Sequence, residues 1–150
     1  MALAALLPGL LLPGLLTACS RPLQLEEPGD GAGDRVGCEQ LIAALPDQVL
    51  DQDRRDVEPG VSTAAWGKPA ITLRCGVAKP STLNAASQCF EVNGVGWFAE
   101  EATGGYLFTT IGRASYVEVC VPTDYAPEAT ALVDLATAVT AHVPLLKPCA

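Results

Sequence analysis

Cysteine is the most reactive residue type in this sequence, and the first of its six cysteines directly follows an apolar N-terminus. Residues 1–18 carry no charge, and Leu16, Thr17 and Ala18 lead into Cys19. A leucine, two small residues and a cysteine form the pattern that lipoprotein processing recognises, in which the thiol accepts a diacylglyceryl group. The pattern predicts a signal peptide over 1–18 and lipidation of Cys19.

The apolar run is too short and too interrupted to be a transmembrane helix. A spanning helix needs about 20 apolar residues, and Pro-Gly pairs at 8–9 and 13–14 interrupt this one. A signal peptide normally opens with Lys or Arg, but nothing basic precedes Arg21. We therefore expect translation to begin upstream of Met1. A cleaved soluble secretory peptide and an uncleaved hydrophobic anchor are the alternatives.

The other five cysteines are expected to form disulfides rather than to bind a metal. No pair has the C-x-x-C spacing of a zinc knuckle, and disulfides are common in exported proteins. We predict a local bridge Cys75–Cys89 and a bridge Cys38–Cys149 between the terminal elements, with Cys120 free. Pairing of Cys120 with Cys75 or Cys89 is the alternative, because neighbouring strands come within disulfide reach.

Two arginines and three aromatic residues form the one set that suggests a ligand-binding groove. The arginines could clamp a carboxylate or phosphate in a bidentate manner, and the aromatic side chains would form the walls. These candidates are Arg74, Arg113, Trp66, Trp97 and Tyr106. We prefer the interpretation in which the aromatic residues pack in the core while the arginines lie on the surface.

The sequence predicts no catalytic residue, metal ligand or cofactor. His142 is the single histidine, and no G-x-S-x-G motif accompanies it. The acidic run over 47–58 contains two arginines and lacks the EF-hand spacing, so it is interpreted as a solvated helix face. An enzyme would need two carboxylates about 5 to 10 Å apart across a groove. The candidates for such a pair are Glu91, Glu100, Glu101 and Glu118.

The pattern of apolar residues predicts one domain over 38–150, preceded by a flexible tether over 19–37 that is rich in Pro, Gly and acids. Helical spacing predicts helices over 38–45, 46–57 and 127–143. Alternation predicts strands over 71–77, 89–92, 95–99, 106–111 and 116–121, with Asn93 and Gly94 as a hairpin turn. The expected fold class is α+β, an antiparallel β-meander covered on one face by N-terminal and C-terminal helices and supported by disulfides.

The formal net charge of −8 restricts the partners that the domain can bind. Nucleic-acid binding depends on clustered Lys and Arg, so it is not expected. The expected partners are the membrane, through the lipid anchor, and an envelope protein or a cell-wall ligand.

The order and spacing of several short motifs resemble a known family. They run from Cys38 and Leu45-Pro46 through Trp66-Gly67-x-Pro69-Ala70-Ile71-x-Leu73-Arg74-Cys75 to Thr109-Thr110-Ile111-Gly112-Arg113 and Tyr116-Val117-Glu118-Val119. This series resembles the actinobacterial family called domain of unknown function 3515, from about residue 38 to the C-terminus. The resemblance implies an envelope-facing, lipoprotein-like protein, and it implies no activity, substrate or catalytic residue.

These observations together predict an exported lipoprotein anchored at the extracytoplasmic face of the cell membrane. The anchor motif, the cysteines and the lack of a catalytic motif favour a non-enzymatic binding or interaction module of the cell envelope. The alternative is an enzyme that acts on cell-wall material with paired carboxylates.

Overall fold

The computed structural model describes residues 21–29 and 33–149. Its main feature is an eight-stranded sheet with two α-helices on one face, so the predicted α+β class is confirmed. The signal peptide over 1–18 and the lipidation of Cys19 lie outside the described residues. Neither helix in this part of the chain is long and apolar enough to cross a membrane.

The strand order across the sheet is β2-β3-β5-β6-β10-β9-β8-β7, and every neighbouring pair is antiparallel. Strands β7 to β10 follow one another as the meander that the sequence predicts, and β10 then pairs with β6. The strands are β2 Gln48–Val49, β3 Gln52–Arg55, β5 Thr63–Trp66, β6 Ile71–Val77, β7 Phe90–Val92, β8 Val95–Ala102, β9 Gly105–Thr110 and β10 Tyr116–Pro122.

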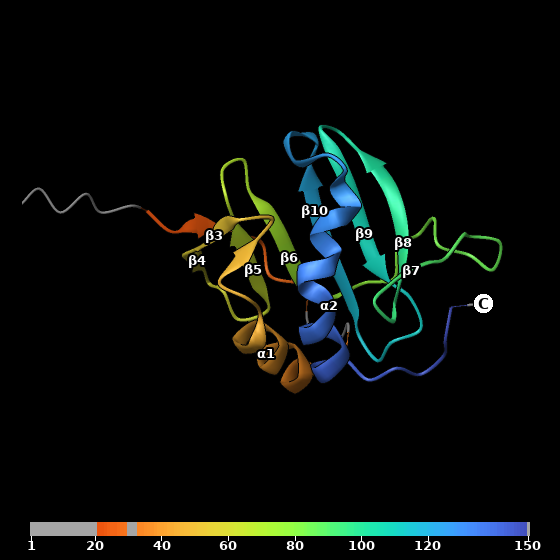
Figure 1. Ribbon diagram of the computed structural model, residues 1–150. Helices are drawn as coiled ribbons and strands as arrows, with labels where there is room; N and C mark the ends of the chain where they lie inside the picture. The colour runs from red at the N-terminus through yellow and green to blue at the C-terminus, as the bar shows by residue number, and fades with distance from the viewer. Residues whose placement is uncertain (1–20, 30–32, 150) are drawn as a thin grey trace, which may run out of the picture.

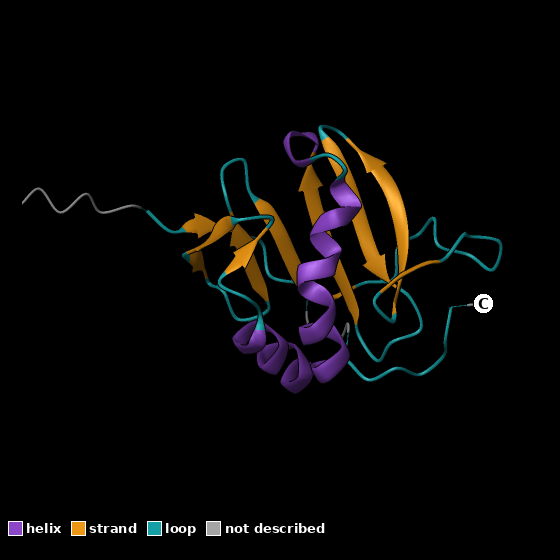
Figure 2. Ribbon diagram, viewed as in Figure 1, coloured by secondary structure: helices purple, strands orange, loops and turns teal. Residues whose placement is uncertain are grey.

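The helices α1 Arg35–Ala44 and α2 Ala131–His142 lie side by side across the same face of the sheet, which we call the helix face (Figures 1 and 2). The apolar positions of α2 fall on one stripe because they recur three and four residues apart. Strand β6 contributes alternate residues to the same core, as its period of two requires. Two short 3-10 helices, η1 Thr123–Tyr125 and η2 Glu128–Thr130, lead into α2.

The helix predicted over 46–57 is wrong. Strands β2 and β3 form a hairpin there, and the two turn residues Leu50 and Asp51 have φ angles of 49° and 59°. The Arg54 side chain donates hydrogen bonds to the carbonyls of Ile42 and Leu45, 2.8 and 3.2 Å away. These bonds satisfy carbonyl groups at the end of α1, which would otherwise have no partner. The polar residues of this segment therefore serve a hairpin and a helix end.

The segment before Cys38 also differs from the expected free tether. Strand β1 Leu23–Gln24 pairs in parallel with β4 Val57–Glu58, and α1 begins at Arg35, three residues before the expected boundary. The Glu27 carboxylate accepts hydrogen bonds from the amides of Val61 and Ser62. Composition did not reveal these contacts, because they join residues more than thirty positions apart.

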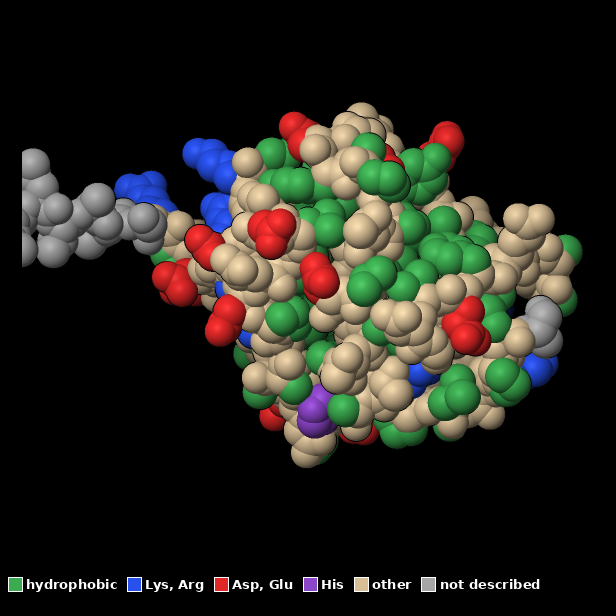
Figure 3. Space-filling model, viewed as in Figure 1, with side chains coloured by type: hydrophobic (Ala, Val, Ile, Leu, Met, Phe, Trp, Pro, Cys, Tyr) green, Lys and Arg blue, Asp and Glu red, His purple; other side chains and the backbone are tan. Residues whose placement is uncertain are grey.

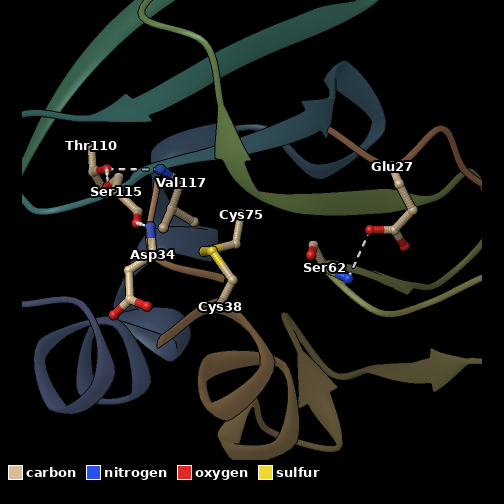
Figure 4. Close-up of a disulfide and its surroundings, with 8 residues drawn as sticks. All are labelled: Glu27, Asp34, Cys38, Ser62, Cys75, Thr110, Ser115 and Val117. Carbon is tan, nitrogen blue, oxygen red and sulfur yellow. Dashed lines mark hydrogen bonds between the residues drawn. A yellow bond between two sulfur atoms is a disulfide. The ribbon is translucent and has the colours of Figure 1, made fainter. Parts of the chain in front are cut away.

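The disulfides link Cys38 to Cys75 and Cys89 to Cys149, and Cys120 is free. The four bridged cysteines and the free one agree with the prediction, but both predicted pairings are wrong. Cys75 lies on the helix face of β6, beneath α1, and so meets Cys38 rather than Cys89. Figure 4 shows this bridge between the helix and the strand.

Candidate functional site

The two tryptophans of the predicted groove lie in the hydrophobic core. Trp66 and Trp97 are both fully buried among core residues. The Trp66 indole donates a hydrogen bond to the carbonyl of Pro46, 3.0 Å away. The Trp97 indole nitrogen has no hydrogen-bond partner among the described residues. Neither ring can form the wall of an open groove, so the preferred interpretation of core packing is correct for both.

Arg113 is buried as well, with 8% of its surface exposed, so the expectation that it lies on the surface is wrong. Its guanidinium donates to the carbonyls of Val143, at 2.6 Å, and Gly94, at 3.0 Å. Burial lowers the pKa of this group from its ordinary value. These hydrogen bonds connect the end of α2 to the turn between β7 and β8. Arg113 therefore has a structural role within the fold.

Arg74 lies on the opposite face of the sheet, which we call the outer face. It forms an ion pair with Glu118 on the adjacent strand β10, with the two side chains 2.8 Å apart. The structure therefore does not bring Arg74, Arg113 and the tryptophans together. The ligand-binding groove suggested for these residues does not exist in the fold. Cys120 lies beside this pair on the same face of β10, and burial, followed by the charge of Glu118, raises the pKa of its thiol.

Three of the four carboxylates considered for acid–base catalysis are engaged with a neighbouring side chain, and the fourth, Glu91, is exposed on β7. Glu118 pairs with Arg74, Glu100 accepts a hydrogen bond from the Thr82 hydroxyl, and Glu101 accepts one from Tyr106. Glu100 and Glu101 are consecutive in β8 and so lie on opposite faces of the sheet. Within 21–29 and 33–149, no group of three or more His, Cys, Asp or Glu side chains could hold a metal ion.

A cluster of three aromatic rings lies on the helix face beyond α2. The Phe90 ring meets Phe108 edge-on, with centroids 6.1 Å apart, and Tyr106 stacks on Phe108 at 6.0 Å. Phe90 and Tyr106 are half-buried, while Phe108 reaches the core. Figure 3 shows hydrophobic side chains gathered on this part of the surface, over β8 and β9. Tyr106 was a predicted binding residue, whereas Phe90 was missed because it begins a very short strand.

A groove lies next to this cluster, at the edge of the sheet. It has a volume of about 610 Å³ and is lined by residues 85–90, Phe98 and Ala99. We call it the edge groove. Strand β7 pairs only with residues 95–97 of β8, so it stops short of the longer strand. The chain before Phe90 turns away at Cys89, which its disulfide holds against Gly96. Within 21–29 and 33–149, no strand pairs with residues 98–102 of β8 on this side, so they form a free sheet edge, visible in Figure 1 beyond the end of β7.

The charge around the edge groove is acidic. Glu100 extends from the outer face of the free edge and Glu101 from the helix face. The hydrogen bond from Tyr106 to Glu101, together with the charge of that carboxylate, raises the pKa of the Tyr106 hydroxyl. No Lys or Arg occurs among the residues that line the groove. A free strand edge with acidic side chains and neighbouring aromatic rings can bind an extended chain, since its main-chain groups and its side chains both remain accessible.

A second cavity, of about 260 Å³, lies beside the Cys38–Cys75 disulfide, between the N-terminal segment and the end of β6. Glu27 lines it, but both of its carboxylate oxygens already accept hydrogen bonds from the segment 61–63. Figure 4 shows Glu27 directed at Ser62. This carboxylate serves the attachment of the N-terminal segment, so we regard the edge groove as the better candidate site.

Comparisons with known proteins give one match. A family model described as a protein of unknown function, DUF3515, matches residues 4–147. No curated protein and no solved structure matches the chain.

Proposed function

The chain belongs to the DUF3515 family, and we propose that it is an exported binding module, tethered by lipid on Cys19 at the extracytoplasmic face of the membrane. In this proposal the domain captures another component of the cell envelope and catalyses no reaction. The anchor motif places the domain next to the membrane, and the edge groove is the surface that binds.

The two disulfides support the exported location. Disulfides persist in oxidising compartments and are rare in cytosolic proteins. One bridge fixes α1 on the sheet, and the other fixes the C-terminal end of the chain, at Cys149, beside Gly96 of β8. Both connect segments that are distant in sequence, as expected for a small domain that must stay folded outside the cell.

The single observation that carries the binding function is the free edge of β8 beside the edge groove. Long unpaired edges are a hazard for soluble proteins, which usually shorten, cover or charge them. Here the edge carries two charges, Glu100 and Glu101, but it continues for five residues beyond β7 and keeps half-exposed aromatic side chains next to it. A surface of this kind is explained when a partner covers it.

The described residues give no comparable support to cell-wall hydrolysis. Glu100 and Glu118 share the outer face, but two strand spacings and a two-residue offset separate them. With strands about 4.8 Å apart and residues about 3.4 Å apart, their Cα atoms lie about 12 Å apart. Paired catalytic carboxylates in glycosidases are about 5 to 9.5 Å apart, and each of these two already has a partner.

Photo-crosslinking in intact cells tests this function. The photoreactive residue p-benzoylphenylalanine replaces Phe98 in the edge groove, and a control carries it at Val36, which is exposed on α1. We expect a discrete crosslinked product from position 98 and none of that mass from position 36. Identical products from both positions, or none from either in the membrane fraction, would contradict the proposal.

A further inference from the structure

We propose that the free edge of β8 binds an extended, basic segment of a partner protein by strand addition, so that the segment becomes a further strand of the sheet. This inference rests on the proposed function and names the class of partner that the edge groove takes.

The main-chain geometry of β8 determines which of its groups are free. The amide of Ile111 donates to the carbonyl of Gly96, so the main-chain groups of Gly96 point toward β9. Directions alternate along a strand, and those of Ala99 and Glu101 therefore point away from β9, to the side where β7 has ended. Neither residue has a main-chain partner on that side among the described parts of the chain. Two donors and two acceptors are thus free in the spacing that an added strand requires.

Space for the added strand is present along the same line. The edge groove lies between the loop residues 85–89 and the β8 residues Phe98 and Ala99, so it continues the position that β7 occupies. Phe90 and Ala99 both line the groove, and the small side chain of Ala99 is exposed on the helix face. A chain lying there would contact Phe98 on the outer face and Phe90 on the helix face.

Charge determines what kind of strand fits. The free edge carries Glu100 on one face and Glu101 on the other, and its lining contains no basic residue. Opposite charges placed directly across a strand pair are favourable, and like charges are unfavourable. An antiparallel second copy centred on Glu100 would place that residue opposite itself, so the edge disfavours self-pairing. A basic partner strand is favoured.

The register then predicts a sequence pattern. Residues opposite Glu100 and Glu101 would be Lys or Arg, and those opposite Phe98 and Ala99 would be apolar. Because the four positions are consecutive, an antiparallel partner reads basic-basic-apolar-apolar from its N-terminus. Only a polypeptide can supply both the main-chain hydrogen bonds and this order of side chains. The expected ligand is therefore an extended peptide segment.

Titration with a defined peptide tests the inference on the full chain purified in mild detergent. The probe is Ser-Thr-Lys-Lys-Val-Val-Thr-Ser. One control replaces both lysines with Glu, and a second carries N-methyl groups on the two amides that would face β8. We expect the unmodified probe to bind at least about tenfold more tightly than either control, since one loses the charge pairs and the other the main-chain hydrogen bonds.

Matched protein variants locate the binding. Ala99→Pro removes an amide that makes no bond within the sheet, and proline is tolerated at such edge positions. We expect it to abolish binding while the melting temperature stays close to that of the parent chain. The double variant E100K/E101K should weaken the lysine probe by about tenfold. The control E39K/E91K changes the net charge equally, at one exposed position on α1 and one on β7, and should retain most of the affinity.

Several outcomes would overturn the inference. Equal affinity for the lysine and glutamate probes would show that charge does not select the partner. Equal affinity for the N-methylated probe would exclude strand addition even if Ala99→Pro failed to fold. A dimer abolished by Ala99→Pro would identify a second copy as the occupant. Slow hydrogen exchange of the Ala99 and Glu101 amides in the absence of a probe peptide would show that residues of the chain itself already pair with this edge. A position-98 crosslink that survives E100K/E101K and Ala99→Pro would reject this partner class but leave the proposed function intact.

Discussion

Arg113 joins two parts of the fold that are distant in sequence. Its two bonded carbonyls belong to Val143, just past α2, and Gly94, in the β7–β8 turn. Arg74 makes its ion pair on the outer face, where both partners keep some contact with solvent. The two arginines therefore carry the same guanidinium group but differ in their access to solvent. Water can take the place of the Arg74 partner more easily than that of the buried Arg113 partners.

Substituting each arginine with Met should separate these roles. Arg113→Met leaves two carbonyls without their charged donor, and bonds to charged groups contribute about 1.5 to 3 kcal/mol each. We expect a loss of about 3 kcal/mol in the free energy of unfolding. Arg74→Met removes a partly exposed ion pair, so the loss should stay below about 1 kcal/mol. Urea unfolding followed by the fluorescence of the two buried tryptophans measures both. Equal losses would contradict the burial argument.

Residue type alone could not distinguish these two positions in the sequence. Arg74 alternates with the core residues of a clear strand, so its place on the outer face followed from the pattern. Arg113 lies in a loop without periodicity, and its burial depends on the return of the C-terminal residues. Core packing was the interpretation preferred for the aromatic residues, but the sequence could not separate the buried Trp66 and Trp97 from the half-buried Tyr106.

Among the elements, the long strands and the final helix were predictable because their apolar residues have a clear period. The segment 46–57 was not, because its few apolar residues fit a short helix as well as two short strands. Its hairpin turn uses Leu50 and Asp51 rather than the Asn-Gly pair that signals such turns. The free edge of β8 had a partial signal, since the strand predicted over 89–92 was already shorter than its partner.

The C-terminal strap, residues 144–149, is an element without helix or strand that Gly112 allows to approach the sheet. Its amides at Leu146 and Lys147 donate to the Gly112 carbonyl, 2.7 and 2.9 Å away. A Cβ on Gly112 would overlap the carbonyl oxygen of Lys147. Gly94 offers a matched control, because its φ of 80° is close to the 72° of Gly112 while nothing lies within 4 Å of its Cβ position.

Replacing each of these glycines with Ala should isolate the contribution of the strap. Both substitutions place a side chain in the left-handed region, at a cost of about 1 to 2 kcal/mol. Gly112→Ala must also displace the strap and weaken two hydrogen bonds, each worth about 1 kcal/mol. We expect it to destabilise the chain by about 2 kcal/mol more than Gly94→Ala in urea unfolding. Equal effects would show that the strap does not contribute to stability.

At the scale of the whole molecule, sequence alone could not provide the cysteine pairing. Faces of strands follow from alternation, but pairing depends on which elements lie above which strands. The position of β10 between β6 and β9 separates Cys75 from Cys89, and the strap brings Cys149 to Cys89 instead. The attachment of the N-terminal segment through β1 and Glu27 is a long-range contact of the same kind.

The whole-molecule arrangement also has a consequence for the tether. Because the chain is attached to the domain from β1 onward, few residues separate Cys19 from the folded surface. A lipid on Cys19 would hold the domain close to the membrane rather than at the end of a long flexible linker. The partner strand would then have to be presented near the bilayer as well.

Fractionation of cells that produce the chain with and without Cys19 tests the central claim most directly. The gene is expressed in a bacterial host behind a basic leader placed before Met1, and Cys19→Ala is the variant. Two acyl chains hold a protein firmly on a membrane, at about 0.8 kcal/mol per buried CH₂. We predict that the parent chain stays in the salt-washed membrane fraction, while Cys19→Ala leaves it and migrates differently on a gel. Unchanged membrane association and mobility in the variant would contradict the account.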